Sequence, residues 1–247
     1  QPALLAHSVA ALRVFGDRHS TWTSPAFAAG HSLGEFSAHV AAGTVTFVDA
    51  LRAVRLRGQL MFKAGEARPG TMAAILGLNV REVREVCHKV RLGVCVPANF
   101  NSAGQIVISG DVSGVEEGIT LAKEAGAKRA VQLNVSGAFH SPLMEPAAEE
   151  LKAFLDDIEF SDPAFPVIAN ATADPVTRGE DARTLLVRQL VSPVRWTESI
   201  EVMASRGVDR FLELGSGKVL TALNRRNAKG LESSALGEPE DFNNLEV

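Results

Sequence analysis

Tyrosine is absent from this chain of 247 residues, and cysteine occurs only twice, as Cys87 and Cys95. Two cysteines cannot supply a disulfide framework, so we expect both to be core residues rather than metal ligands, in a reducing compartment such as the cytoplasm. No apolar run approaches the roughly 18 to 20 residues that cross a bilayer, and we expect no membrane partner. The net charge of −4 leaves no excess of basic residues, which argues against a nucleic-acid partner.

The remaining composition, 46% hydrophobic and 22% charged, is that of an ordinary globular protein. In residues 1–65 and 136–247, helical stretches alternate with short apolar strands, a pattern typical of an α/β sheet. Residues 66–135 have the order β-α-β-β-α-β instead, which is typical of a ferredoxin-like unit. We therefore predict an α/β fold with a hydrolase-like, parallel-sheet large subdomain and an inserted ferredoxin-like small subdomain. After Gly230 the composition becomes polar, and we expect the tail from Gly237 to be loosely held.

The sharpest local signal is a G-x-S-x-G motif at residues 30–34, between a short apolar strand and a helix. A serine on such a tight turn has strained backbone angles, and its neighbours must lack side chains so that strand and helix can pass closely. This geometry would project the hydroxyl of Ser32 and aim the N–H of Leu33 at an oxyanion formed there. The alternative is a glycine-rich helix start in which Ser32 is only a capping hydroxyl.

A serine hydroxyl needs a base to become a nucleophile at neutral pH, and six histidines are available. The side chain of His31 should diverge from that of Ser32, and His39 lies two helical turns farther along. His140 is the best candidate, because it follows a predicted strand in a loop that leads into a helix, where α/β enzymes place catalytic groups. The alternative is a solvated or structural loop histidine.

Arg57 lies on a predicted helix over residues 47–63 and has only apolar residues three and four positions away on either side. A guanidinium among apolar groups is costly unless an anion meets it, and its planar fork suits a carboxylate. That carboxylate could come from an acidic residue elsewhere in the fold. It could equally be the free carboxylate of a dicarboxylic acyl substrate, and the sequence pattern does not decide between the two.

These segments together are similar to the malonyl-CoA:acyl carrier protein transacylases and to the related acyltransferase domains of polyketide synthases. The resemblance covers essentially the whole chain, and several motifs agree in order, which makes it more specific than any one of them. Residues 1–5 resemble the family's segment ahead of the serine, and residues 30–38 its nucleophile motif. The other matching stretches are Arg57-Gly58, residues 137–141, Gln189-Leu190, residues 193–196 and residues 213–218.

By position, the resemblance implies that Ser32 is the nucleophile and His140 its general base. It also implies that the imidazole is oriented by the backbone carbonyl of Gln189 in place of an aspartate, which still fixes the tautomer. Arg57 would bind the malonyl carboxylate bidentately and so distinguish malonyl from acetyl groups. Phe139 resembles the malonyl-selecting form of the histidine loop, and its bulk would disfavour a methyl branch on the α-carbon.

The reaction implied is transfer of a malonyl group from malonyl-CoA to the phosphopantetheine thiol of an acyl carrier protein through an acyl-Ser32 intermediate. Coenzyme A is then part of a substrate, and no cofactor is expected. The resemblance leaves open whether the product serves fatty acid biosynthesis or polyketide synthesis. Asn99 and Asn101 resemble family positions near the cleft between the subdomains and receive no specific role.

The family also begins with a strand and a Gly-Gln-Gly loop, whose glutamine contributes to the oxyanion hole, and nothing before Gln1 supplies them. Losing one oxyanion donor typically costs about 10²–10³ in rate, and a missing strand would expose a sheet edge. We therefore expect a protein made only of these residues to be poorly active and prone to aggregate.

Three other functions are compatible with the same residues. A serine hydrolase of esters or thioesters would use the same turn, would not need Arg57, and would pass the acyl group to water. A carrier-protein docking module would bind its partner without acylation. The chain could also be an acyltransferase domain excised from a polyketide synthase.

Overall fold

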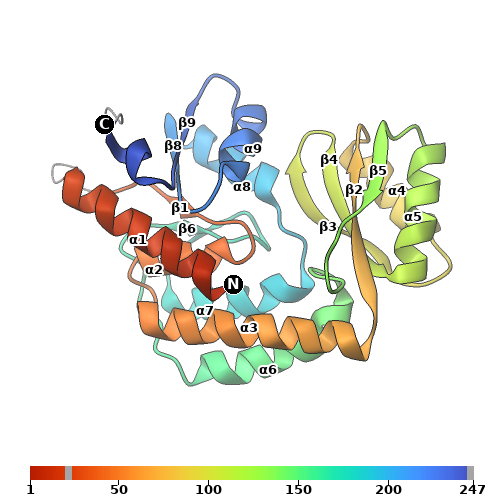
Figure 1. Cartoon of the computed structure of the whole chain (residues 1–247), viewed down its shortest axis with the longest axis horizontal. Helices are drawn as coiled ribbons and strands as arrows, with labels where there is room; N and C mark the ends of the chain where they lie inside the picture. Colours follow the sequence, from red (N-terminus) through yellow and green to blue (C-terminus); the bar gives the residue numbers. More distant parts are fainter. Residues whose placement is uncertain (20–23, 244–247) are drawn as a thin grey trace.

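A computed structural model describes residues 1–19 and 24–243, which form a larger and a smaller part joined side by side (Figure 1). The long helix α3 runs from the larger part to the edge of the smaller one. The elements of the larger part are α1 (Pro2–Arg18), β1 (Ala28–Ala29), α2 (Gly34–Ala41), α3 (Phe47–Ala67), η1 (Pro142–Met144), α6 (Glu145–Asp156), β6 (Val167–Ile168), β7 (Pro175–Val176), α7 (Gly179–Arg188), η2 (Gln189–Val191), α8 (Trp196–Ser205), β8 (Arg210–Leu214), α9 (Val219–Asn227), β9 (Glu232–Leu236) and η3 (Pro239–Asn243).

The sheet of the larger part consists of two short pieces with parallel pairing. Strand β1 pairs with β6 in parallel, and β8 pairs with β9 in parallel, as predicted for an α/β fold. Strand β7 adds an antiparallel edge to β6 and was not predicted, because a two-residue strand leaves no periodic pattern. Its Pro175 suits an edge position, since proline has no N–H to give to a further strand.

The smaller part contains β2 (Gly70–Leu76), α4 (Val80–Lys89), β3 (Cys95–Ser102), β4 (Gln105–Asp111), α5 (Val112–Glu124) and β5 (Arg129–Gln132). Its four strands form an antiparallel sheet in the order β3-β4-β2-β5, and α4 and α5 pack on the face turned away from the larger part (Figure 1). This is the β-α-β-β-α-β succession expected for a ferredoxin-like unit. Subdomain boundaries at 65/66 and 135/136 stay a prediction.

The main core lies where α3 and α6 pack against each other and against α1, α2 and α7. Apolar residues recur on one face of α3, including Ala53, Val54, Leu60 and Met61, which are all at most 5% exposed. This spacing of three and four residues places them on a single stripe. Arg57 falls on the same stripe, so the helix that builds the core also places one cation inside it.

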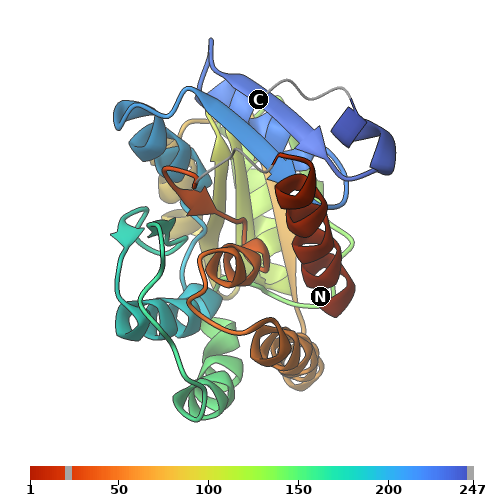
Figure 2. The same cartoon turned by 90° about the vertical axis from the view of Figure 1, so that its left-hand side faces the viewer.

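The two parts are joined by a short parallel bridge between Asn99 of β3 and Val194. The N–H of Phe100 donates to the carbonyl of Val194, and the N–H of Val194 donates to the carbonyl of Ala98, both at 2.8 Å. Seen from the end in Figure 2, the small sheet lies behind the helices of the larger part. The turn between β1 and α2 lies next to the seam between the two parts, because Nε2 of His31 in this turn lies 2.8 Å from Oδ1 of Asn101 in β3.

The expectation of a loosely held tail is wrong for residues 237–243. Strand β9 precedes them and pairs along its whole length with β8, and Phe242 is buried in a cluster with Phe15. The composition of β9, Glu-Ser-Ser-Ala-Leu, hid the strand, because its backbone ladder needs few apolar side chains. Residues 244–247 lie outside the described part. No helix in the described part is both long and apolar enough to span a membrane.

Candidate active site

The turn between β1 and α2 holds Ser32 in the left-handed region, with φ of 53°. A Cβ atom on Gly30 would lie 1.9 Å from the carbonyl oxygen of Gly34, so strand and helix can approach this closely only with glycine at position 30. We expected both glycines of the motif to be required for this close approach. That expectation is wrong for Gly34, where a Cβ atom would meet nothing within 4 Å. One glycine of the motif is therefore required by packing, and the other is not.

Asn170, two residues after the end of β6, holds this turn in place. Its Oδ1 accepts the backbone N–H of Ser32 at 2.6 Å, and its Nδ2 donates to the carbonyl of Gly30 at 2.8 Å. Sequence reasoning missed this residue. The available signal was its place at the carboxyl end of a strand that is parallel to β1, because such ends meet at one sheet edge.

Ser32 does not cap the helix, so that alternative is wrong. The N-cap residue of α2 is Leu33, which makes no side-chain capping bond, and among the described residues the Ser32 hydroxyl forms hydrogen bonds with two side chains only, those of His140 and Arg57. The N–H of Leu33 has no acceptor among the described residues. A free N–H at the start of a helix, one residue after the hydroxyl, is suited to a developing oxyanion.

His140 is the histidine that the fold brings to Ser32. Its Nε2 lies 2.8 Å from Ser32 Oγ, and its Nδ1 lies 2.9 Å from the carbonyl oxygen of Gln189. A carbonyl only accepts, so Nδ1 carries the proton and Nε2 is free to accept the serine proton. Burial, followed by the charge of Arg57, lowers the pKa of His140 to about 3, which keeps the imidazole neutral at physiological pH.

Arg57 is buried beside the same hydroxyl and is only 1% exposed. Its Nη2 donates to Ser32 Oγ at 3.0 Å and to Gln189 Oε1 at 2.9 Å, and its Nη1 donates to Gln1 Oε1 at 2.7 Å. All three acceptors are neutral oxygens. Within residues 1–19 and 24–243 Arg57 forms no ion pair, and its Nε has no hydrogen-bond partner. Among the described residues, therefore, no acidic side chain lies at hydrogen-bond distance from Arg57, in contrast to the first alternative.

The guanidinium keeps its charge despite this burial. Desolvation lowers the pKa of Arg57 to about 10, partly offset by the nearby carboxyl of Glu35, so the side chain stays protonated at neutral pH. A buried cation with only neutral partners attracts an anion strongly, because the low-dielectric surroundings screen its charge weakly. The hydroxyl of Ser32 is thus hydrogen-bonded to a buried cation that has no anionic partner at hydrogen-bond distance among the described residues.

Glu35 is the second functional residue that sequence reasoning missed. It lies on α2, is completely buried, and its Oε2 accepts from the backbone N–H of Asn170 at 3.1 Å and from Gln189 Nε2 at 2.6 Å. Burial raises the pKa of this carboxyl to about 7. The signal in the sequence was an acidic residue on the side of α2 that also carries the buried His39.

Phe139 precedes His140 and is partly buried where the main core meets the smaller cluster of Met72, Ala98 and Val107. Asn101 of β3 reaches the serine turn directly, because its Oδ1 lies 2.8 Å from Nε2 of His31. The structure thus brings Ser32, His140, Gln189 and Arg57 into mutual contact, with Leu33 and Phe139 as chain neighbours of two of them. Among the described residues no group of three or more His, Cys, Asp or Glu side chains could hold a metal ion.

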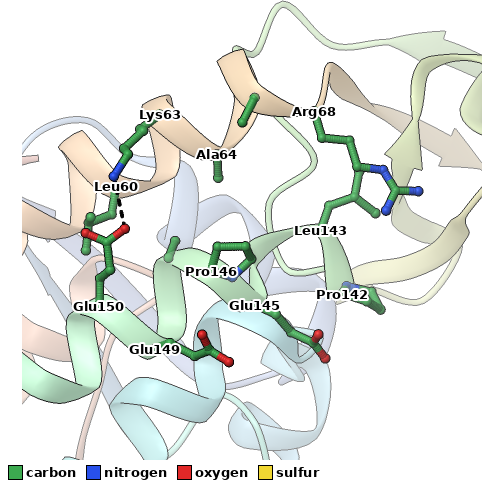
Figure 3. Close-up of a pocket in the computed structure, with 12 residues that line it drawn as sticks. Leu60, Lys63, Ala64, Arg68, Pro142, Leu143, Glu145, Pro146, Glu149 and Glu150 are labelled. Carbon is green, nitrogen blue, oxygen red and sulfur yellow. Dashed lines mark hydrogen bonds and ion pairs between the residues drawn. The ribbon is translucent and has the colours of Figure 1, made fainter.

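A separate groove lies between α3 and the start of α6 (Figure 3). Its walls carry both apolar and charged side chains, and an ion pair between Lys63 and Glu150 crosses it at 3.1 Å. None of the residues around the Ser32 hydroxyl lines this groove. The groove is therefore separate from the site at Ser32.

Known proteins match nearly the whole chain. The acyl transferase domain family matches residues 1–238. The malonyl CoA-acyl carrier protein transacylase of Bacillus subtilis (strain 168) is 49% identical over 242 residues, which are 97% of this chain and 75% of that protein. The transacylase of the same name from Escherichia coli (strain K12) is 47% identical over 240 residues, which are 97% of this chain and 77% of that protein.

Two solved structures share the fold. The acyl carrier protein S-malonyltransferase of Vibrio cholerae has a TM-score of 0.95 and 46% identity, covering 98% of this chain and 79% of that one. A malonyl-transacylase solved in complex with a type II polyketide synthase acyl-carrier protein has a TM-score of 0.92 and 44% identity, covering 98% and 78%. The chain is therefore an acyltransferase with the predicted fold, and it belongs to the malonyl-CoA:acyl carrier protein transacylase family.

Proposed function

We propose that this protein transfers a malonyl group from malonyl-CoA to the phosphopantetheine thiol of an acyl carrier protein through an acyl-Ser32 intermediate. The observation that carries this proposal is the 3.0 Å contact between the guanidinium of Arg57 and the hydroxyl of Ser32. In a malonyl thioester one methylene separates the carboxylate from the reacting carbonyl, so one short diacid can reach both groups. The names of the relatives, which are malonyl CoA-acyl carrier protein transacylases, support the same substrates.

In the first half-reaction, Nε2 of His140 takes the proton of Ser32 as Oγ attacks the thioester carbonyl carbon. The negative charge then lies on the former carbonyl oxygen, close to the N–H of Leu33. Collapse of this adduct breaks the carbon–sulfur bond. The departing coenzyme A sulfur takes the proton from the imidazolium, which leaves malonyl-Ser32, neutral His140 and free coenzyme A thiol.

The second half-reaction runs the same steps in reverse with a different thiol. His140 takes the proton of the carrier's phosphopantetheine thiol, and the sulfur attacks the ester carbonyl of malonyl-Ser32. The serine oxygen leaves and recovers its proton from His140. Coenzyme A enters only as part of the substrate, and the scheme uses no cofactor.

Arg57 would supply both selectivity and part of the rate. A bound malonyl carboxylate would replace the neutral acceptors of the guanidinium with a charge-assisted, bidentate contact, which an acetyl group cannot form. The malonyl carboxylate would also offset the positive charge of Arg57, which helps to lower the pKa of His140. Because the base is then easier to protonate, binding of the correct acyl group would favour the imidazolium that forms during attack. The bulk of Phe139 would disfavour a branched α-carbon.

The carrier decides which pathway the malonyl group enters. The similar proteins include one called fabD and one bound to a carrier of a polyketide synthase, so either fatty acid or polyketide synthesis fits the site. We place the reaction in the cytoplasm, in keeping with two free cysteines, Cys87 and Cys95.

The experiment that tests this function follows coenzyme A release from malonyl-CoA with and without a holo acyl carrier protein, and identifies the acyl acceptor. We expect a single turnover without the carrier and steady turnover with it, with malonyl found on the phosphopantetheine thiol. Steady release of free malonate without a carrier would identify a thioester hydrolase instead. Carrier binding with no release in either case would identify a docking module.

A further inference from the structure

The carboxyl group of Glu35 is a buried acidic group that the proposed mechanism leaves without a task. It is 0% exposed, and both of its hydrogen bonds go to Oε2, while Oε1 has no partner among the described residues. Burial of an acidic group is costly unless hydrogen bonds or an opposite charge compensate it, and here two hydrogen bonds to one oxygen do so only in part. Its two donors, Gln189 and Asn170, each lead to the reacting serine.

The first arm runs through the side chain of Gln189. Its Nε2 donates to Glu35 at 2.6 Å and to the carbonyl of Ser32 at 2.9 Å, and its Oε1 accepts from Arg57 at 2.9 Å. An amide group has one donor end and one acceptor end. If it turned over, N–H groups would face the guanidinium and oxygen would face the carboxylate. Glu35 and the carbonyl of Ser32 therefore both favour the orientation in which the oxygen of Gln189 meets Arg57, and Glu35 makes the shorter of these two contacts.

The second arm runs through the backbone of Asn170. Glu35 accepts its N–H at 3.1 Å, and the Asn170 side chain in turn holds the N–H of Ser32. Glu35 thus hydrogen-bonds neither the hydroxyl of Ser32 nor the guanidinium of Arg57. It is connected to Ser32 through Asn170 and to Arg57 through Gln189. The interposed amide also keeps the carboxylate out of a direct ion pair with Arg57, which would compete with a substrate carboxylate for the same fork.

We propose that Glu35 is a positioning residue that fixes the orientation of the Gln189 amide and so keeps the fork of Arg57 directed at the carboxylate of the acyl substrate. This role rests on the proposed function, because it concerns selection of a malonyl over an acetyl group. Loss of Glu35 should act mainly on the substrate that carries a carboxylate. A residue that only stabilises the fold would affect both substrates alike.

The test compares acylation by malonyl-CoA and acetyl-CoA, each as kcat and KM, in the wild type and three variants at position 35. Glu35→Ala removes the acceptor, whereas Glu35→Gln keeps a carbonyl oxygen for both donors. Glu35→Asp keeps the carboxyl group but is one methylene too short, and it serves if the alanine variant does not fold. His39→Gln is the matched control, because His39 is an equally buried polar residue on α2, and among the described residues its ring hydrogen-bonds Thr44 alone.

We expect Glu35→Ala to reduce the malonyl-to-acetyl preference by about tenfold or more, mainly through the KM for malonyl-CoA, as for a displaced charge-assisted hydrogen bond. Glu35→Asp should reduce the preference less, Glu35→Gln should restore most of it, and His39→Gln should match the wild type. The proposal is overturned if the alanine and aspartate variants keep the wild-type preference, or if the glutamine variant loses as much as alanine. A wild type that transfers no malonyl would refute the proposed function itself, and this role with it.

Discussion

The Nε2 atom of His140 lies 2.8 Å from the Oγ atom of Ser32, and both residues have a positive φ, of 58° and 53°. A non-glycine residue in this region costs on the order of 1–3 kcal/mol and persists only where its surroundings hold it. Here the amide of Asn170 holds one residue and the carbonyl of Gln189 holds the other. Two of the three described non-glycine residues with positive φ are thus the proposed nucleophile and base.

The two glycines of the serine turn should differ sharply in their tolerance to substitution. Gly30→Ala would drive a Cβ atom into the Gly34 carbonyl, so we expect lost acylation and a lower melting temperature. Gly34→Ala meets no atom and adds a better helix former at the start of α2, so it should fold normally. Thermal melting measures the stability of each variant, and the yield of acylated protein measures its acylation. Equal behaviour of the two variants would contradict the strained turn.

His140→Ala should reduce the rate of acylation by about 10³- to 10⁴-fold, because it removes the base that takes the serine proton. The fold should persist, since the loop is held by other contacts such as the bond from Ser141 Oγ to the Ala138 carbonyl. His88→Ala, at an exposed histidine of α4, is the control and should acylate at the wild-type rate. Stopped-flow release of coenzyme A gives the rate. Comparable rates in both variants would assign the base elsewhere.

Arg57→Ala should weaken malonyl transfer by at least about 10²-fold and acetyl transfer much less, because only the malonyl group has a carboxylate for the buried cation. Arg57→Lys keeps the charge but loses the bidentate fork, so it should recover only part of the selectivity. Arg55→Ala removes an exposed arginine from the same helix and serves as the control. Competition between malonyl-CoA and acetyl-CoA gives the ratio directly. An unchanged ratio in Arg57→Ala would remove the arginine from substrate recognition.

The buried histidine of α2 should make the protein less stable in acid. Burial lowers the pKa of His39 from 6.5 to about 4, so stability is fully present above pH 6.5 and is lost as pH falls toward 4. Between pH 7.5 and pH 5 the wild type should therefore lose about 2 kcal/mol relative to His39→Gln. Urea unfolding at both values measures this difference. The comparison isolates His39, because both proteins retain His140 and Glu35. As the pH falls, titration of His140 also lowers stability, whereas titration of Glu35 raises it. No difference between the proteins would show that His39 titrates normally.

The sequence predicted those parts of the molecule whose pattern is local. The motif at residues 30–34, the apolar stripe of α3 and the β-α-β-β-α-β succession all lie within short stretches, and each formed the expected element. The four residues predicted to act together, Ser32, His140, Gln189 and Arg57, do meet in one place. Their convergence followed from resemblance to a family, since no spacing along the chain encodes it.

The parts that could not be predicted depend on contacts between distant segments. Glu35 and Asn170 are 135 residues apart, and the residues around each in the sequence do not predict that the carboxylate of one meets the backbone N–H of the other. The neutral acceptors of Arg57 were equally hidden, because the sequence shows only that its helical neighbours are apolar. Strands β7 and β9 were missed for the related reason that backbone pairing, and not an apolar side-chain pattern, defines them.

The central claim is that Ser32 carries the malonyl group during transfer. The most direct test mixes the protein with malonyl-CoA, measures its intact mass, and locates any added group by peptide mapping, with Ser32→Ala alongside. The account predicts one malonyl group per chain, found on the peptide that contains Ser32, absent from the variant and removed by a holo carrier protein. A malonyl group on another residue, or transfer by the Ser32→Ala variant, would contradict it.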